Sequence, residues 1–221
     1  MTNFPKIFCI TLKDTPERKK IADKHFKDNG LYVEFFEGIN GKKFGLKTSI
    51  PYNDDSIEKS DYYILHGKIG CLLSHYMLWQ TLLYLPYDEI IILEDDAYLC
   101  DNFIEKFFLY KNQLPSNWEY VFLGYSCFNE FNLPSNINDK IIKCKIPPLG
   151  TFGYMIKKSA IPILLDTNHQ AWAPVDIQIQ KKSLENLNHY ICSPPLINHR
   201  LHYLNDKSKI FDSLTEDKIY Q

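Results

Sequence analysis

The sequence predicts an α/β fold in which helices flank a mostly parallel central sheet. Three observations support this prediction. Short apolar runs typical of buried strands alternate with segments of helical periodicity. Hydrophobic residues make up 45% and charged residues 24% of the chain, which is close to the average for globular proteins. A length of 221 residues is enough to bury the core of one large domain.

The expected elements begin with a strand, a helix and a second strand. Residues 7–12 are mostly apolar and include β-branched side chains, which favours a strand. Asp14 or Thr15 can cap a helix that starts at Pro16 and ends near Gly30. Residues 31–36 then form the second strand.

A long, buried helix is expected from Ile69, because apolar residues recur there at helical spacing, and Pro86 ends it. The remaining expected elements are strands at 89–93, 120–124 and 151–156, a helix at 103–110, a helix capped by Ser159 and a helix capped by Asp176 that runs towards Asn188.

We expect residues 1–204 to form a single domain and residues 205–221 to form a C-terminal tail. Two loop excursions, at 38–61 and 126–145, interrupt the domain, because their composition is typical of loops.

The most informative segment is the apolar run from Ile90 to Leu93, which ends in Glu94, Asp95 and Asp96. Ligands of open α/β sheets bind beyond the carboxyl ends of the strands. Three adjacent carboxylates repel one another unless a cation offsets them, and hard oxygen ligands suit Mg²⁺ or Mn²⁺. The segment therefore predicts a divalent metal that holds a phosphorylated ligand. A polar boundary between strand and loop is the alternative.

Charge and cysteine usage narrow the class of protein. The net charge is −2 and no basic stripe is present, so a nucleic-acid partner is not expected. The six cysteines are scattered without a C-x-x-C pair, which indicates thiols in a reducing compartment. No apolar leader or membrane span is evident, so we expect a cytoplasmic protein and leave peripheral membrane contact open.

Four segments, taken together and in order, resemble glycosyltransferase family 25, which includes the lipooligosaccharide β-galactosyltransferases. They are Ile-x-Leu-x5-Arg at 10–18, Phe-Phe-Glu-Gly-Ile-Asn-Gly at 35–41, Gly-x-Ile-Gly-Cys-Leu-Leu-Ser-His at 67–75 and Ile-Leu-Glu-Asp-Asp-Ala at 92–97. Gly150-Thr151 with Tyr154, Pro174-Val175-Asp176 and Pro194-Pro195-Leu196 also fit. Lys68 departs from the pattern, because the family usually has an acid there, and this puts the sugar preference in doubt.

The resemblance implies a GT-A-type, Rossmann-like fold, a nucleotide-sugar donor and inversion at the anomeric carbon. UDP-galactose is the family's commonest donor. The implied acceptor is a sugar of a lipooligosaccharide or similar glycolipid, met at the inner face of the cytoplasmic membrane.

Glu94-Asp95-Asp96 then matches a metal-binding Asp-x-Asp motif whose first acid is glutamate. We assign Asp96 to the metal, Glu94 to the metal or the ribose, and Asp95 to the same cluster. Mn²⁺ is preferred over Mg²⁺. His199 can complete the metal shell, although a surface histidine is the simpler interpretation. A metal that bridges the diphosphate stabilises the charge that grows on the leaving group.

The donor side is completed by the first strand and the long helix. Thr11 and Leu12 can present backbone groups to the base and ribose. Arg18 can pair with phosphate or base, and a solvated helix residue is the alternative. Ser74 and His75 face the donor if they are not simply buried in the core.

An inverting displacement also needs a base that takes the proton of the acceptor hydroxyl. We assign this role to Asp176, for which a plain helix cap is the alternative. Gly150, Thr151 and Tyr154 line the acceptor pocket, and the glycine allows a close backbone approach.

Two other classes of function stay open. A metal-dependent phosphohydrolase of nucleotide sugars would use the acids to activate water. A catalytically silent carbohydrate- or nucleotide-binding module would bind without turnover.

Overall fold

The computed structural model describes residues 4–43, 61–126, 140–144 and 146–199. Most of the predicted excursions at 38–61 and 126–145, and the whole predicted tail at 205–221, lie outside these residues.

Among the described residues, the central sheet has seven strands in the order β2-β1-β3-β7-β5-β8-β6. β2, β1, β3, β5 and β8 run in one direction, and β7 and β6 run in the other. The predicted α/β class with a mostly parallel sheet is therefore confirmed. The strands are β1 (Lys6–Thr11), β2 (Glu34–Glu37), β3 (Glu89–Glu94), β5 (Tyr120–Phe122), β6 (Ile141–Ile142), β7 (Gly153–Lys157) and β8 (His189–Cys192).

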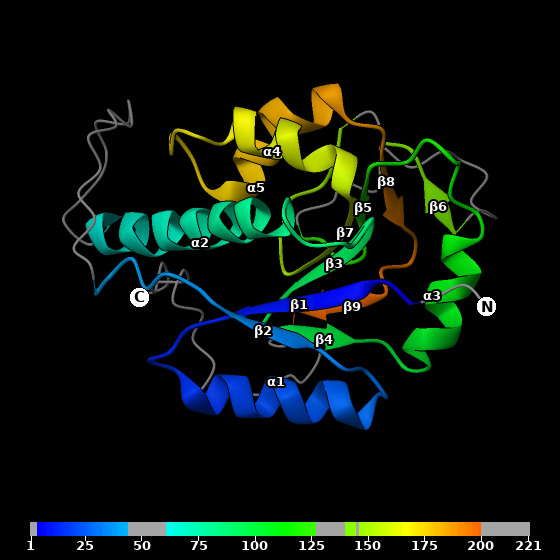
Figure 1. Cartoon of the computed structure of the whole chain (residues 1–221), viewed down its shortest axis with the longest axis horizontal. Coiled ribbons are helices and arrows are strands. Elements are labelled where there is room, and N and C mark those ends of the chain that lie inside the picture. Colours follow the sequence, from blue (N-terminus) through cyan, green and yellow to red (C-terminus); the bar gives the residue numbers. More distant parts are fainter. Residues whose placement is uncertain (1–3, 44–60, 127–139, 145, 200–221) are drawn as a thin grey trace.

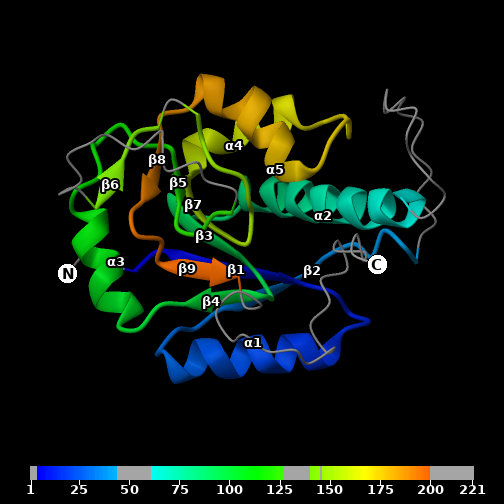
Figure 2. The same ribbon diagram turned by 180° about the vertical axis from the view of Figure 1, so that it is seen from behind.

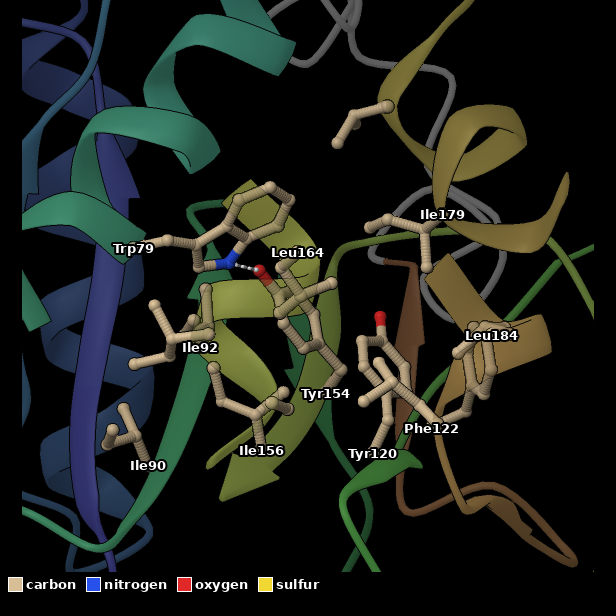
Figure 3. Packing of buried hydrophobic residues seen from close by; sticks show 14 of the residues in the cluster. Trp79, Ile90, Ile92, Tyr120, Phe122, Tyr154, Ile156, Leu164, Ile179 and Leu184 are labelled. Atoms are coloured by element: carbon tan, nitrogen blue, oxygen red, sulfur yellow. Dashed lines mark hydrogen bonds between the residues drawn. The ribbon is translucent and has the colours of Figure 1, made fainter. Parts of the chain in front are cut away.

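Helices cover both faces of the sheet (Figures 1 and 2). Alternate residues of β3 point to opposite faces, so Ile90 and Ile92 pack in one core and Ile91 and Leu93 in the other. The first core, part of which Figure 3 shows, includes residues of α2 (Asp61–Leu82), α4 (Ile161–Thr167) and α5 (Val175–Gln178). The second includes residues of α1 (Pro16–Asp28) and α3 (Phe103–Lys111).

A separate two-stranded sheet follows the acidic segment. β4 (Ala97–Leu99) pairs antiparallel with β9 (Ile197–His199), and Ala97 is opposite His199. This pairing brings the end of the described chain next to Asp96, which lies between β3 and β4.

Several predicted boundaries need correction. The long helix begins at Asp61 rather than Ile69 and ends at Leu82, before Pro86. The second strand is β2 at Glu34–Glu37 instead of the predicted 31–36. Leu31 lies before the strand and packs in the second core. Ser159 lies inside a 3₁₀ turn at Lys158–Ala160, so it does not cap α4.

The last predicted helix is also divided. Pro174, not Asp176, occupies the N-cap position of α5. The chain continues as a π-helix at Ile179–Ser183 and a 3₁₀ turn at Leu184–Asn186. The start of α1 at Pro16 is confirmed, but the hydroxyl of Thr15 donates to Leu12 O instead of capping the helix.

Candidate functional site

A pocket lies at the carboxyl ends of β1 and β3, where the acidic segment begins. The segments that line it are the end of β1 with the start of α1, the chain after β2, one face of α2 and residues 94–96. Its volume of about 80 Å³ is smaller than the roughly 300 Å³ at which typical ligand pockets start. The described residues therefore enclose room for an ion and phosphate oxygens rather than for a whole nucleotide sugar.

Arg18 neutralises part of the acidic segment. Its Nε donates to Asp95 Oδ1 at 3.0 Å, and its Nη2 contacts the same oxygen and lies 3.2 Å from Asp96 Oδ2. Asp95 Oδ2 accepts a hydrogen bond from Thr11 Oγ1 at 3.2 Å. Both oxygens of Asp95 are thus engaged within the protein, and the cation that offsets two of the three acids is Arg18. The sequence predicted a phosphate or a base as the partner of Arg18, and its contacts with Asp95 and Asp96 were not anticipated.

Asp96 differs from Asp95 because one of its oxygens has no hydrogen-bond partner among the described residues. Asp96 Oδ2 lies 3.3 Å from His199 Nε2, whereas Oδ1 is buried and has no hydrogen-bond partner in the described part of the chain. Burial opposes the charged form, but His199 and Arg18 outweigh it and hold the pKa of Asp96 below its ordinary value. Asp96 is therefore an ionised carboxylate that offers a buried oxygen.

Glu94 is held from two sides. Thr151 Oγ1 donates to Glu94 Oε1 at 2.6 Å, and His75 Nε2 lies 3.3 Å from the same oxygen. His75 Nδ1 contacts the hydroxyl of Tyr154 at 2.8 Å. The structure thus brings predicted donor residues, Glu94 and His75, together with the predicted acceptor residue Thr151.

Glu94 and Asp96 offer oxygen atoms whose chemistry suits a divalent metal ion. Carboxylate oxygens of Glu94 and Asp96 are the hard ligands that Mn²⁺ and Mg²⁺ prefer. The partnerless Oδ1 of Asp96 is an oxygen that such an ion would satisfy. Among the described residues, the group of three ligand atoms that lie within 4.8 Å of one another is a softer one, formed by the sulfur of Cys71 with His75 and Glu94.

Thr11 and Leu12 line the pocket, but their carbonyls already accept hydrogen bonds. Gly38 N donates to Thr11 O at 2.8 Å, and Thr15 N donates to Leu12 O at 3.2 Å. Ser74 also has an internal role, because its hydroxyl accepts from Ile39 N and donates to Gly70 O. These contacts hold the chain after β2 against α2.

Two motif glycines cross in close contact beside the pocket. A Cβ on Gly41 would lie 1.7 Å from His66 O, and one on Gly70 would lie 2.6 Å from Gly41 N. Only glycine allows this approach, which places Asn40 and Lys42 at the pocket. Sequence reasoning assigned no role to Asn40, Lys42 or Cys71, although the first two flank a motif glycine and Cys71 precedes His75 by one helical turn.

Asp176 lies close to the same cluster but does not line the pocket. Its Oδ1 accepts from Ile177 N at 2.9 Å, and the backbone of Gly150 also binds the carboxylate. Burial raises the pKa of Asp176, and the charge of Glu94 adds to the rise. Gly150 has a φ of 109°, a backbone conformation that favours glycine. This conformation is sufficient to explain why a glycine occupies the position.

Tyr154 and Lys68, two residues of the family pattern, do not line the pocket. Tyr154 is 0% exposed, and its hydroxyl accepts a hydrogen bond from Trp79 (Figure 3) and contacts His75 Nδ1. This hydroxyl therefore has its partners inside the core, and the assigned contact with the acceptor stays a prediction. The strand alternation turned this side chain into the first core with α2, whereas its neighbour Met155 packs in the second core. Lys68 lies on α2 and does not line the pocket, whereas its neighbour Gly67 does.

The described residues contain no helix that is both long and apolar enough to span a membrane.

Comparisons with known proteins agree on one family. The model of glycosyltransferase family 25 (LPS biosynthesis protein) matches residues 4–179. A glycosyltransferase 25 family member of Aedes aegypti is 26% identical over 96% of this chain and 38% of its own length. The lipooligosaccharide biosynthesis protein lic2B of Haemophilus influenzae is 29% identical over 73% of this chain and 65% of its own length. Procollagen galactosyltransferase 2 of Homo sapiens is 23% identical over 55% of this chain and 21% of its own length.

This chain spans less than half the length of the insect and human relatives. The family model nevertheless matches residues from β1 to the start of the π-helix, and therefore most of the described sheet and the whole acidic segment. The chain belongs to glycosyltransferase family 25.

Proposed function

We propose that this chain is an inverting hexosyltransferase that moves galactose from UDP-galactose onto a sugar of a lipooligosaccharide or a similar surface glycan. Family membership supports sugar transfer, and the names of the Haemophilus and human relatives support the acceptor class and the sugar. The observation that carries the proposal is the buried Oδ1 of Asp96, which has no hydrogen-bond partner among the described residues and belongs to the pocket that Glu94 also lines.

The donor end is built from the acidic segment. Asp96 and Glu94 would hold Mn²⁺ or, less favourably, Mg²⁺, which lowers the barrier by neutralising the charge that grows on the departing UDP. Arg18 holds Asp95 and Asp96 in place, and its positive charge would lie near a diphosphate bound through those acids. His199 keeps Asp96 ionised and oriented, which is a supporting role beside its predicted one as a ligand.

The acceptor end is built around Asp176. As the acceptor hydroxyl attacks the anomeric carbon, the Asp176 carboxylate takes its proton, and UDP leaves from the opposite face with inversion. A raised pKa strengthens the carboxylate as a base near neutral pH. Gly150 and Thr151 connect Asp176 to Glu94 and so couple the two ends of the site.

The same proposal places the enzyme in the cytoplasm, at the inner face of the membrane, where a lipid-linked acceptor and a nucleotide sugar meet. Peripheral contact would suffice for this reaction.

The test is a panel of UDP-galactose, UDP-glucose and UDP-N-acetylglucosamine, each with a lipooligosaccharide core acceptor and either Mn²⁺ or a chelator. We expect product only with acceptor and Mn²⁺, most of it from UDP-galactose. Donor hydrolysis at the same rate without acceptor would indicate a phosphohydrolase. Donor binding without turnover under any divalent ion would indicate a silent binding module.

A further inference from the structure

A chain of hydrogen bonds connects the core under α2 to Glu94. Trp79 Nε1 donates to the hydroxyl of Tyr154 at 3.0 Å, a contact that Figure 3 shows. The same hydroxyl lies 2.8 Å from His75 Nδ1, and His75 Nε2 lies 3.3 Å from Glu94 Oε1. Trp79, Tyr154 and His75 are each 0% exposed, so water does not compete for these contacts.

The direction of the chain follows from counting protons. An indole N–H can only donate, so the oxygen of Tyr154 must accept from Trp79. The phenol proton of Tyr154 then needs an acceptor, and an unprotonated His75 Nδ1 provides it. In neutral imidazole the other nitrogen carries the proton, so Nε2–H points at Glu94 Oε1.

The opposite direction is unfavourable. If Nδ1 carried the proton, the Tyr154 oxygen would face two donors, Trp79 and His75, and its own proton would have no acceptor between them. A buried donor that loses its partner is destabilising. The ring centroids of Tyr120 and Tyr154 are 5.1 Å apart and the angle between the ring planes is 8°, so Tyr120 covers one face of the Tyr154 ring.

We propose that His75 is a positioning residue whose Nε2–H, with the hydroxyl of Thr151, fixes Glu94 Oε1 and so leaves Oε2 for the donor and its ion. This proposal rests on the proposed function for the role of Glu94, but the tautomer of His75 does not depend on it. Partners that orient a ligand in this way commonly change metal affinity or activity by about 10–100-fold when they are lost.

One arrangement on the same residues competes with this proposal. Cys71, His75 and Glu94 could instead bind a soft ion such as Zn²⁺, because their ligand atoms lie within 4.8 Å. That role needs an unprotonated Nε2 and therefore the opposite tautomer. The two arrangements exclude each other, so a single spectroscopic measurement separates them.

The first experiment measures the tautomer directly. Long-range ¹⁵N–¹H spectra of protein labelled in histidine distinguish protonated from unprotonated ring nitrogens, and a His75→Gln sample identifies the signals. We expect His75 to carry its proton on Nε2 in the resting protein, and to lose this preference in Tyr154→Phe. A proton on Nδ1 in the wild type would overturn the proposal, whatever the protein transfers.

The second experiment adds Co²⁺ as a probe of the soft-ion arrangement. A sulfur-to-cobalt absorption band that disappears in Cys71→Ser would show that Cys71 and its neighbours bind the ion, and would overturn the proposal. No such band is expected, because Nε2 is occupied by its proton.

The third experiment compares two variants of His75 by kinetics. His75→Leu removes the donor to Glu94, and we expect the KM for donor and the Mn²⁺ requirement to rise about 10–100-fold. His75→Gln offers an amide N–H at a similar reach and should recover most of that loss. A purely structural role would lower kcat at unchanged KM. Equal kinetics of the two variants would contradict the proposal, and an absence of transfer in the wild type would instead contradict the proposed function.

Discussion

The guanidinium of Arg18 contacts both Asp95 and Asp96, and the three side chains are 14%, 8% and 14% exposed. One cation thus binds two of three adjacent acids at the mouth of the pocket. With one positive and three negative charges, the group of Arg18, Glu94, Asp95 and Asp96 keeps a surplus negative charge that suits a divalent ion.

Replacing Arg18 by Gln should therefore destabilise the fold. Removing one partner of a buried ion pair commonly costs about 3–5 kcal/mol, and two acids lose their partner here. We expect a loss of about 3 kcal/mol in chemical denaturation. Lys24→Gln is the control, because its pair with Asp28 is exposed and should contribute less than about 1 kcal/mol.

The same variant tests the charge balance. Mn²⁺ should raise the Tm of Arg18→Gln more than that of the wild type, because the ion replaces part of the lost positive charge. An equal shift in both proteins would mean that Arg18 and the ion do not share the acids.

Asp96→Asn tests the oxygen that has no partner. The amide keeps the shape of the side chain but loses the charge that would hold the ion, so transfer should fall by more than the roughly 100-fold that loss of a supporting partner can cause. Mn²⁺ binding, measured by calorimetry, should weaken in parallel. Asp101→Asn is a matched control, because this acid is exposed. Unchanged transfer by a folded Asp96→Asn would remove Asp96 from the metal site.

The sequence predicted those features that depend on local pattern. The apolar run at 89–93 became β3 and ends at Glu94, so the acids lie at the carboxyl end of a strand, as expected. The α/β class and Pro16 at the start of α1 are also confirmed, because alternation and helix-start signals lie within a few residues.

What the sequence could not show depends on long-range contacts. Arg18 and Asp95 are 77 residues apart in the sequence. No local pattern could therefore show that the arginine pairs with the acids of the chain itself rather than with a phosphate. Strand character at Tyr154 left open which face the ring takes, and the partners that decide it, Trp79 and His75, lie on α2. The contact between Gly41 and Gly70 joins two motifs that are far apart in the sequence. Taken by itself, each glycine is typical of a loop or of a helix, and neither predicts the contact.

Asp176→Asn tests the base. Donor binding should persist, whereas transfer should fall by about 10²–10⁴-fold, because the acceptor proton has no carboxylate to take it.

In the wild type, activity should decline as the pH falls through a pKa above the ordinary aspartate value of 3.8, because protonation of Asp176 removes the base. A pH profile that is flat down to that value would argue against Asp176. Asp166→Asn, at an exposed position, is the matched control.

The stability of the same variant should change in the opposite sense. The pKa of Asp176 is raised in the fold, chiefly by burial, so between 3.8 and the raised value the folded state binds more protons than the unfolded chain. Stability from this group is therefore present at low pH and is lost as the pH rises through that window. At pH 7 the neutral side chain of Asp176→Asn removes the cost of burying a charge, so the variant should be more stable than the wild type. Each kcal/mol gained in the free energy of unfolding would raise Tm by about 2–4 °C. An unchanged or lower Tm would show that the hydrogen bonds from Ile177 and Gly150 outweigh burial.

Gly41→Ala tests whether backbone packing shapes the donor pocket. The added Cβ would lie 1.7 Å from His66 O, a backbone atom that cannot rotate away, so the chain after β2 must shift. Asn40 and Lys42 would move with it, and the bond from Ile39 N to Ser74 would weaken. We expect a loss of about 1–3 kcal/mol in stability, typical of an overpacked site, with a rise in donor KM that exceeds any fall in kcat. A variant with normal stability and donor KM would mean that the crossing of Gly41 and Gly70 does not hold the pocket in shape.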